Sequence, residues 1–478
     1  MSSLLKNLSW KFAERSSVQL VSLVVSIYIA RILEPTDYGV VAMVNIFITL
    51  ANVFVNESFG SALIQKKQAD NLDFSSVLYF NIGFSILLYL ILYFSAPLIT
   101  SFYGEGYAIL TPILRVLGIQ VIVAGVYSVA QAYVSRKMMF RLFFYSSLSG
   151  TLLSAIVGLI MAKKGFGPWA LVGQSLTATF VNCGCLLLMI RQKPILAFSF
   201  TRLKELFHYG AKILGSGLLI VGFQELRALI IGKLYSGKDL AFFDKGRQFP
   251  NMIVTSISTS IGAVLFPKMS QEQDNIDSIK QITRNSIRFS SFIMVPLMFG
   301  LATIAKPLVC ILLTDKWLPC VPLLQWFCIV YLFQPIHTAN MQAIKAIGRS
   351  DVYLKLEIFK KVVEILTLLA VMFISVDAIV INMAVLTTLF TFVNAYPNHK
   401  LLSYTFREQM ADILPSVIRS AIMALGVLLF SLIPMNIYLS FGLQIAIGVI
   451  IYLSLALLCK NKELLFFIDK FKTFVLKK

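Results

Sequence analysis

A few charged residues interrupt stretches that are otherwise apolar, and these are the positions where the chain could do chemistry. Glu225 and Arg227 lie two residues apart inside the run GLLIVGFQELRALIIG. Arg31 and Lys233 each close an apolar run, and Arg247 stands in FDKGRQFP. Guanidinium and ammonium groups form strong charge-assisted hydrogen bonds with phosphate and carboxylate oxygens. These five residues therefore predict a binding site for an anionic substrate.

Each of these residues also has a structural alternative. Glu225 and Arg227 are about 200° apart around a helix, so they cannot readily pair with each other. They could instead form salt bridges to neighbouring helices. Arg31 and Lys233 could snorkel toward lipid headgroups, and Arg247 could be an ordinary loop charge.

Three further positions carry other chemistry. Glu57, in VNESFG, could couple transport to protons or sodium, accept sugar hydroxyls, or only hydrogen-bond a neighbouring helix. Lys360 and Lys361, in LKLEIFKKVVEIL, could capture an anionic headgroup. Alternatively, they could be neutralised by Glu357 and Glu364, which stand at helical pair spacings from them.

The elements that carry these residues are long apolar runs. Of the 478 residues, 58% are hydrophobic and 14% are charged, whereas soluble domains are about 25% charged. The runs are continuous and do not alternate, which predicts helices and excludes barrel strands. Their length suits membrane-spanning helices of about 20 residues. Fourteen runs are found, at 15–33, 39–64, 76–97, 111–133, 144–163, 168–190, 211–232, 251–267, 289–312, 318–343, 355–374, 378–396, 413–434 and 437–458.

The net charge of +19 comes from 42 Lys and Arg against 23 Asp and Glu. In a soluble protein this excess would suggest nucleic acid. In a membrane protein, basic residues collect in cytoplasmic loops. With the N-terminus inside, 27 of the 42 basic residues fall in inner loops and the tail. We therefore predict cytoplasmic N- and C-termini and no nucleic-acid partner.

Catalytic and cofactor chemistry is not indicated. The three His and six Cys have no metal-ligand spacing, and no loop exceeds about 20 residues, which excludes a large catalytic domain outside the membrane. The run GKLYSGKD approximates a phosphate-binding loop, but Asp239 replaces the Mg²⁺-binding Ser or Thr and an apolar span precedes the run. We expect a transporter without metal or cofactor, and not an enzyme.

An internal repeat indicates the domain organisation. Shifted by 202 residues, segment 30–68 meets a similar segment, and a shift of 210–211 aligns PIL at 112 with PLL at 322. An even offset in span number predicts two parallel six-helix bundles with a central cleft and alternating access. The predicted divisions are bundles at 1–197 and 198–405, two further helices at 406–460, and a basic amphipathic cytoplasmic tail at 461–478.

Smaller predictions concern single residues. Asp37 and Asp239 match across the repeat, and we expect each to cap the helix that follows. Arg419 falls near the start of its apolar run, so we expect its side chain to snorkel to the membrane surface.

Several stretches resemble the Wzx-like polysaccharide transporter branch of the multidrug/oligosaccharidyl-lipid/polysaccharide (MOP) flippase superfamily, namely ARILEPTDYGVVAM, FGSALIQKK, GFGPWALVGQ, FHYGAKILGS, DKWLPCVPLLQ and AIGRSD. The resemblance implies an all-α fold of fourteen helices, as 6+6+2. It also implies a flippase of undecaprenyl-diphosphate-linked oligosaccharides for surface polysaccharide and lipopolysaccharide biosynthesis. The implied location is the bacterial cytoplasmic membrane. The implied partners are the lipid-linked substrate, membrane lipids and other polysaccharide assembly proteins.

Two rival functions were weighed. A MATE-like, ion-coupled antiporter of small molecules would usually need acidic residues for cationic substrates. Here six cations lie within the apolar runs against four carboxylates. A membrane-embedded glycan enzyme is disfavoured by the short loops.

Overall fold

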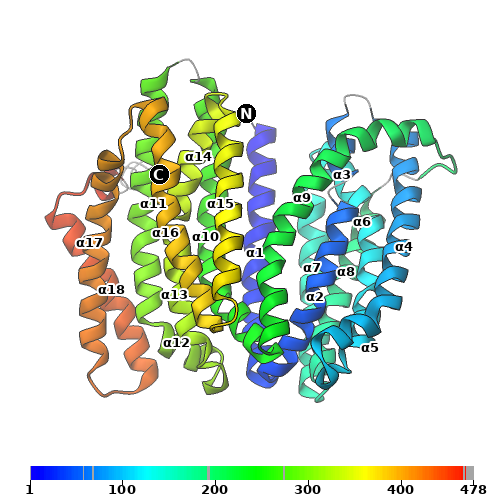
Figure 1. The fold of residues 1–478 in the computed structure, drawn as a ribbon, viewed down its shortest axis with the longest axis horizontal. Helices are drawn as coiled ribbons and strands as arrows, with labels where there is room; N and C mark the ends of the chain where they lie inside the picture. Colours follow the sequence, from blue (N-terminus) through cyan, green and yellow to red (C-terminus); the bar gives the residue numbers. More distant parts are fainter. Residues whose placement is uncertain are drawn as a thin grey trace. The chain divides into compact units, whose positions relative to one another are not determined.

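The computed structural model describes residues 2–56, 59–66, 69–190, 194–272, 275–466 and 469. Every regular element in those ranges is a helix, which confirms the all-α prediction. In each half of the chain the long helices run side by side (Figure 1). The elements are α1 (Ser2–Ile32), α2 (Pro35–Asn56), α3 (Gly60–Gln65), α4 (Asn71–Tyr103), η1 (Glu105–Tyr107), α5 (Leu110–Leu117), α6 (Ile119–Arg136), α7 (Phe140–Lys163), α8 (Pro168–Met189), α9 (Phe200–Leu234), α10 (Gly237–Gln271), α11 (Ile276–Thr303), α12 (Ala305–Leu312), η2 (Asp315–Trp317), α13 (Cys320–Leu332), α14 (Gln334–Ala346), α15 (Ser350–Val371), α16 (Val376–Leu402), α17 (Phe406–Ser431) and α18 (Ile437–Leu458).

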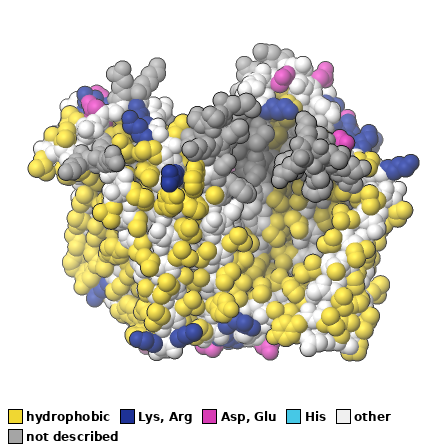
Figure 2. All heavy atoms as spheres, turned by 180° about the vertical axis from the view of Figure 1, so that it is seen from behind, with side chains coloured by type: hydrophobic (Ala, Val, Ile, Leu, Met, Phe, Trp, Pro, Cys, Tyr) yellow, Lys and Arg dark blue, Asp and Glu magenta, His cyan; other side chains and the backbone are white. Residues whose placement is uncertain are grey.

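Within the described residues, twelve segments are long and apolar enough to cross a membrane. They match twelve of the fourteen predicted runs. The other two runs fall in α10 and α15, which have 35 and 22 residues. Six ionisable side chains lower the hydropathy of α15. Hydrophobic side chains cover most of the visible face, and charged side chains gather toward its upper and lower ends (Figure 2). The chain is therefore a multi-pass membrane protein.

Three predicted spans are each broken into two helices. The run 111–133 is interrupted at Gly118, where an added Cβ would lie 2.9 Å from the Leu114 carbonyl oxygen and 3.1 Å from the Tyr89 ring. The runs 289–312 and 318–343 are broken at Ile304 and Phe333. Each break divides one predicted span into two helices while the apolar composition continues, so hydropathy alone does not reveal it.

Two compact units divide the chain, Met1–Ala241 and Phe242–Lys478. Helix α9 belongs to the first unit because it packs against α2, α3 and α4. The predicted repeat boundary at 197/198 instead assigns α9 to the second repeat. This boundary concerns the internal repeat and stays a prediction.

Backbone geometry recurs at the predicted repeat offset. The 3₁₀ turns η1 and η2 begin 210 residues apart, at Glu105 and Asp315. The residue before each has a positive φ, 118° at Gly104 and 83° at Thr314. Both halves therefore use the same turn, although only one of them has glycine, the residue that adopts this conformation without strain.

Small residues bring the helices of the first unit together. Added Cβ atoms at Gly150 and Gly158 of α7 would lie 3.0 Å from the Ala178 carbonyl oxygen and from Gln174 Cβ of α8. On α1, Ile29 is fully buried in a cluster with Ala155 of α7. Such close backbone approaches are the usual way in which helices associate in membranes.

Candidate functional site

The predicted cations at the ends of α1 and α9 differ in what they contact. Arg31 lies exposed in the last turn of α1. Lys233, in the last turn of α9, donates a hydrogen bond to the Phe102 carbonyl oxygen, and its Nζ lies 4.8 Å from the centre of the Phe102 ring. That carbonyl is at the C-terminal end of α4, where cations are favoured. Lys233 thus has a structural contact as well as its predicted binding role.

The turn between α9 and α10 is closely packed on α2. The Gly237 N–H donates to the Tyr107 hydroxyl at 2.9 Å. A Cβ on Gly39 would lie 2.0 Å from the Gly237 carbonyl oxygen. Gly39 can therefore not be enlarged without moving backbone, whereas a Cβ on Gly237 would lie 3.3 Å from the Met43 methyl group.

The two matched aspartates lie in the first turns of α2 and α10, at the third helical position and not at the N-cap that we expected. The Asp37 carboxylate accepts the Glu34 N–H at 3.0 Å, at the start of α2. The Asp239 N–H donates to Ser236 Oγ at 3.1 Å, and Ser236 Oγ donates to the Asp239 carboxylate at 2.6 Å. The repeat pair therefore stabilises two equivalent helix starts.

Glu225 and Arg227 are the two ionisable residues of α9 between Ile213 and Gly232. Both side chains are half-buried. Ionisable groups at such depth are costly and, in membrane proteins, characteristic of substrate or ion pathways. Their predicted binding role is compatible with this position and remains a prediction.

Arg247 lies in a charged segment of α10 that sequence reasoning recognised only in part. Its guanidinium pairs with Asp244 at 2.9 Å and lies 5.7 Å from the centre of the Phe243 ring. Lys245 is 6% exposed, and its Nζ donates to Gln248 Oε1 at 3.1 Å. The missed signal was available: the repeat aligns DKGRQ in α10 with AMVNI in α2, so the charges are confined to one half.

The lysine pair of α15 is paired with glutamates. Lys360 contacts Glu357 at 2.5 Å, and Lys361 contacts Glu364 at 3.0 Å. The predicted neutralisation of these lysines by Glu357 and Glu364 is confirmed, with Lys360 bonded to Glu357 and Lys361 to Glu364. Capture of a headgroup by these lysines remains a prediction. Glu57 lies outside the described residues.

Three of the four predicted binding cations, Arg31, Arg227 and Lys233, belong to the first unit, and Arg247 belongs to the second. Within the first unit, Arg227 and Lys233 are six residues apart on α9 and so occupy different levels of that helix. The set is therefore a series of separate positions along the chain.

Arg419 is a correction. It was expected to snorkel, but it is 6% exposed. Its guanidinium donates to the Pro415 carbonyl oxygen at 2.8 Å and lies 6.0 Å from the centre of the Tyr452 ring. Helix α17 begins at Phe406, earlier than the apolar run, so Arg419 lies more than three turns inside it.

A buried carboxylate in the first unit was missed by sequence reasoning. Asp73, near the start of α4, has a fully buried side chain. Lys66 Nζ lies 2.8 Å from its carboxylate, and a guanidinium nitrogen of Arg202 lies at 3.6 Å. Asp70 and Asp73 also form a capping box. The Asp73 N–H, donated to the Asp70 carboxylate, lowers the pKa of Asp70, and the Arg202 charge contributes.

A second buried carboxylate lies in the other unit. Asp412 of α17 has a side chain that is 1% exposed. Its oxygens accept hydrogen bonds from two arginines of α11, Arg284 at 2.7 and 3.1 Å and Arg288 at 2.6 Å, and from the Tyr404 hydroxyl at 2.8 Å. The two arginines lie more than 120 residues from Asp412 in the sequence, so the local sequence around Asp412 contains no signal for their charges.

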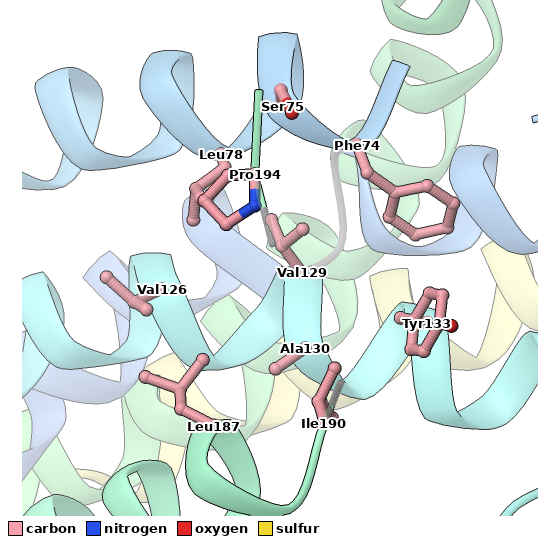
Figure 3. Close-up of a pocket in the computed structure, with 10 residues that line it drawn as sticks. All are labelled: Phe74, Ser75, Leu78, Val126, Val129, Ala130, Tyr133, Leu187, Ile190 and Pro194. Atoms are coloured by element: carbon pink, nitrogen blue, oxygen red, sulfur yellow. The ribbon is translucent and has the colours of Figure 1, made fainter. Parts of the chain in front are cut away.

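Among the hollows that the described residues form, one of about 470 Å³ lies between α11, α13 and α17 in the second unit. Two others with apolar walls bear on the proposed function. In the second unit, a groove of about 460 Å³ runs between α11, α17 and α18, lined by Leu297, Gly300, Val427, Gly448 and Tyr452 among others. In the first unit, a cavity of about 80 Å³ lies between α4, α6 and α8, with Pro194 at one side (Figure 3). Neither lining suits a charged ligand by itself.

Comparisons with known proteins agree on one family and one fold. The model of a family described as "Polysaccharide biosynthesis protein" matches residues 28–322. The chain is 25% identical over 317 residues to the succinoglycan biosynthesis transport protein ExoT of Rhizobium meliloti (strain 1021), covering 65% of this chain and 63% of that protein. It is 23% identical to the teichuronic acid biosynthesis protein TuaB of Bacillus subtilis (strain 168), covering 63% and 62%. The match therefore spans a little under two thirds of the length of these relatives.

Solved structures show the same fold. The lipid II flippase MurJ in an inward closed conformation superposes with a TM-score of 0.76 at 15% identity, covering 95% of this chain and 99% of MurJ. An inward-facing MATE-family multidrug transporter of the MOP superfamily gives 0.65 at 14% identity, covering 81% and 94%. The predicted MOP-type fold is confirmed, and so is the predicted family resemblance.

Proposed function

The chain belongs to the polysaccharide biosynthesis protein family, and from this premise we propose that it moves lipid-linked oligosaccharide repeat units across a membrane. The family match over residues 28–322 carries the proposal. Relatives named for succinoglycan transport and teichuronic acid biosynthesis support it. So does the shared fold with a lipid II flippase. The proposed protein is a transporter and not an enzyme.

The proposed membrane arrangement has fourteen spans, with both termini in the cytoplasm of a bacterial inner membrane. Helices α10 and α15 supply the two spans beyond the twelve apolar ones. Their lengths of 35 and 22 residues are sufficient, because about 20 residues cross a hydrocarbon core. The proposed division is two related bundles at 1–197 and 198–405, two helices at 406–460 and a cytoplasmic tail at 461–478. The basic inner loops support the orientation.

The substrate's charged head is proposed to bind Arg227 within α9, and Arg31 and Lys233 in the last turns of α1 and α9. Arg247 of the second unit is proposed as a separate contact. A diphosphate cannot enter hydrocarbon without compensating charge, and guanidinium and ammonium groups provide it. Glu225 would accept hydrogen bonds from sugar hydroxyls. The half-buried positions of Glu225 and Arg227 in an otherwise apolar span support this path.

The polyprenyl tail is proposed to lie along the groove between α11, α17 and α18. This groove has a volume of about 460 Å³ and apolar walls. Its glycines, Gly300 and Gly448, leave space where side chains would otherwise fill it. An apolar chain that enters the groove exchanges contacts with lipid tails for contacts with apolar side chains. Because the two kinds of contact are similar in free energy, the chain could move along the groove at little cost.

Energy coupling is proposed to use an ion gradient, with Glu57 as the candidate proton or sodium site. Separately, Lys360 and Lys361 are the candidate residues that first bind the anionic headgroup. The alternative function, MATE-like antiport of small molecules, is weaker. The MATE structure superposes with a lower TM-score than MurJ and covers less of this chain.

The function is tested in a strain that lacks the gene. Lipid-linked repeat units should accumulate on the cytoplasmic face, and the wild-type gene should restore surface glycan. Arg227→Ala should restore little glycan although it is expressed. Arg227→Lys, which keeps the charge, should restore most of it. Normal surface glycan in the deletion strain, together with new drug sensitivity, would favour the antiporter.

A further inference from the structure

The segment 194–200, which joins α8 to α9, is fastened to the side of α4. We call it the linker. It has no regular secondary structure before α9 begins. Three hydrogen bonds hold its backbone to the first turns of α4: Ile195 N–H to Ser75 Oγ at 3.0 Å, the Tyr79 hydroxyl to the Ile195 carbonyl oxygen at 3.1 Å, and Ser199 N–H to Ser76 Oγ at 3.0 Å.

The four large apolar side chains of the linker are exposed. Leu196 is 98% exposed, and Ile195, Phe198 and Phe200 are exposed as well. The serines that hold the backbone, Ser75 and Ser76, are buried. The backbone of the linker is therefore held against α4, and four of its large apolar side chains are exposed.

Charged groups lie beside the linker, toward the N-terminal end of α4. Arg202, two residues after the linker, contacts Asp70 and Asp73 at 3.6 Å. Lys204 is exposed. The linker is bonded to Ser75, Ser76 and Tyr79, which follow Asp73 along α4. At about 1.5 Å per residue, these residues lie about 3–9 Å further along the helix axis than Asp73. A polar level followed within 5–10 Å by an apolar one matches the boundary between headgroups and acyl chains.

We propose that the linker is an interfacial anchor, with Ile195, Leu196, Phe198 and Phe200 inserted into the acyl boundary of the leaflet at the N-terminal end of α4. Arg202 and Lys204 contact the headgroups. The partner is an anionic phospholipid surface, because basic residues close to a membrane are attracted to anionic headgroups. In the proposed topology this is the cytoplasmic leaflet.

The apolar cavity behind the linker fits this assignment. Pro194 covers one side of it, beside Leu78 of α4 (Figure 3). The cavity is on the inner side of the linker, whereas Leu196 is almost fully exposed. The outward side chains therefore do not fold back into the space available, and a lipid surface is what removes them from water.

Photo-crosslinking of the full-length protein tests the anchor. Leu196 is replaced by the photoreactive residue benzoylphenylalanine, and the protein is placed in nanodiscs of phosphatidylethanolamine and phosphatidylglycerol. After irradiation, the intact mass should increase by one phospholipid, with phosphatidylglycerol enriched above its share of the bilayer. The same replacement at Leu188, which is 87% exposed on α8, is the positive control. Replacement at Asn275, exposed before α11, is the control for a water-facing position.

The outcomes separate lipid from protein partners. Irradiation in cells that yields a protein-sized adduct at Leu196, and no lipid adduct, would replace the lipid surface by a cytosolic protein. An unmodified mass at Leu196 in nanodiscs, with lipid on the Leu188 variant, would overturn the anchor. Neither readout requires transport, so failure here is distinguishable from failure of the proposed function.

Discussion

Among the described residues, each unit has one buried carboxylate, and the two carboxylates are held differently. Asp73 has one close cation, Lys66, and a more distant one, Arg202, whose side chains are 21% and 38% exposed. Asp412 accepts hydrogen bonds from two arginines and a tyrosine, all at 3.1 Å or less. The first cluster joins α4 to the start of α9, and the second joins α11 to α17.

The difference shows how the number of close hydrogen bonds sets the importance of a buried charge. If Asp73 is removed, Lys66 still has Glu205 at 3.6 Å and Arg202 still has Asp70 at 3.6 Å. If Asp412 is removed, two arginines directed at one buried point are left facing each other. Removing one partner of a buried ion pair is costly mainly because of the charge that stays behind. The second cluster should therefore be the more important for stability.

Asp412→Ala has the largest expected effect. It should lower the free energy of unfolding by about 3–5 kcal/mol, because it leaves Arg284 and Arg288 uncompensated. The measurement is the thermal unfolding midpoint of the purified protein. Tyr404→Phe removes one hydrogen bond and no charge, so it is the matched control and should cost about 1 kcal/mol. Equal midpoints for Asp412→Ala and wild type would contradict the comparison.

Asp73→Ala should cost less, about 1–2 kcal/mol. It removes the return bond of the capping box and one close ion pair with a partly exposed lysine. The same midpoint assay applies. A double-mutant cycle with Arg202→Gln should give a small coupling energy, since the Asp73–Arg202 separation is 3.6 Å. A loss as large as that of Asp412→Ala would show that the number of close hydrogen bonds is not the deciding factor.

The capping residues of α17 and α9 extend the comparison. Thr405→Ala should cost about 1 kcal/mol, because Thr405 and Glu408 form a full capping box. Ser199→Ala should cost less, since Ser199 Oγ accepts the Arg202 N–H at the longer distance of 3.4 Å. Comparing the two midpoints ranks the caps, and a reversed order would contradict the geometry.

The smallest expected effect is a pH dependence at Asp70. Its pKa is lowered in the folded protein, so its carboxylate stabilises the fold above about pH 4, its unfolded pKa. This contribution is lost as the pH falls through the lowered pKa. Asp70→Asn should therefore destabilise slightly at pH 7 and flatten the decline in midpoint below pH 4. Parallel pH curves for the variant and wild type would exclude this contribution.

The sequence predicts the elements much better than their mutual contacts. Twelve spans, the helical fold and the family follow from long apolar runs and short motifs, which are local signals. Asp412 was missed because its arginine partners, Arg284 and Arg288, lie far away in the chain. Asp73 was missed although Lys66 and Asp70 lie within seven residues of it, because the sequence does not reveal its burial. Arg419 was misplaced because α17 extends beyond its apolar run, so that hydropathy underestimated the depth of the residue.

The breaks at Gly118, Ile304 and Phe333 are also invisible to local composition. Each lies within a continuous apolar run, so composition predicts one helix where packing requires two. The charged run DKGRQ of α10 was visible, yet only Arg247 was selected from it. The burial of Lys245 depends on packing against Trp317, which the sequence does not reveal.

The central claim is that this chain carries a lipid-linked oligosaccharide across a bilayer, and reconstitution tests it most directly. Purified protein is placed in liposomes whose lipid-linked oligosaccharide is labelled in both leaflets, and a membrane-impermeant glycosidase is added outside. Empty liposomes should lose about half of the label. With the protein, transfer between leaflets should bring nearly all of it to the enzyme, and Arg227→Ala should slow this second phase. Loss of only half of the label with active wild-type protein would contradict the account.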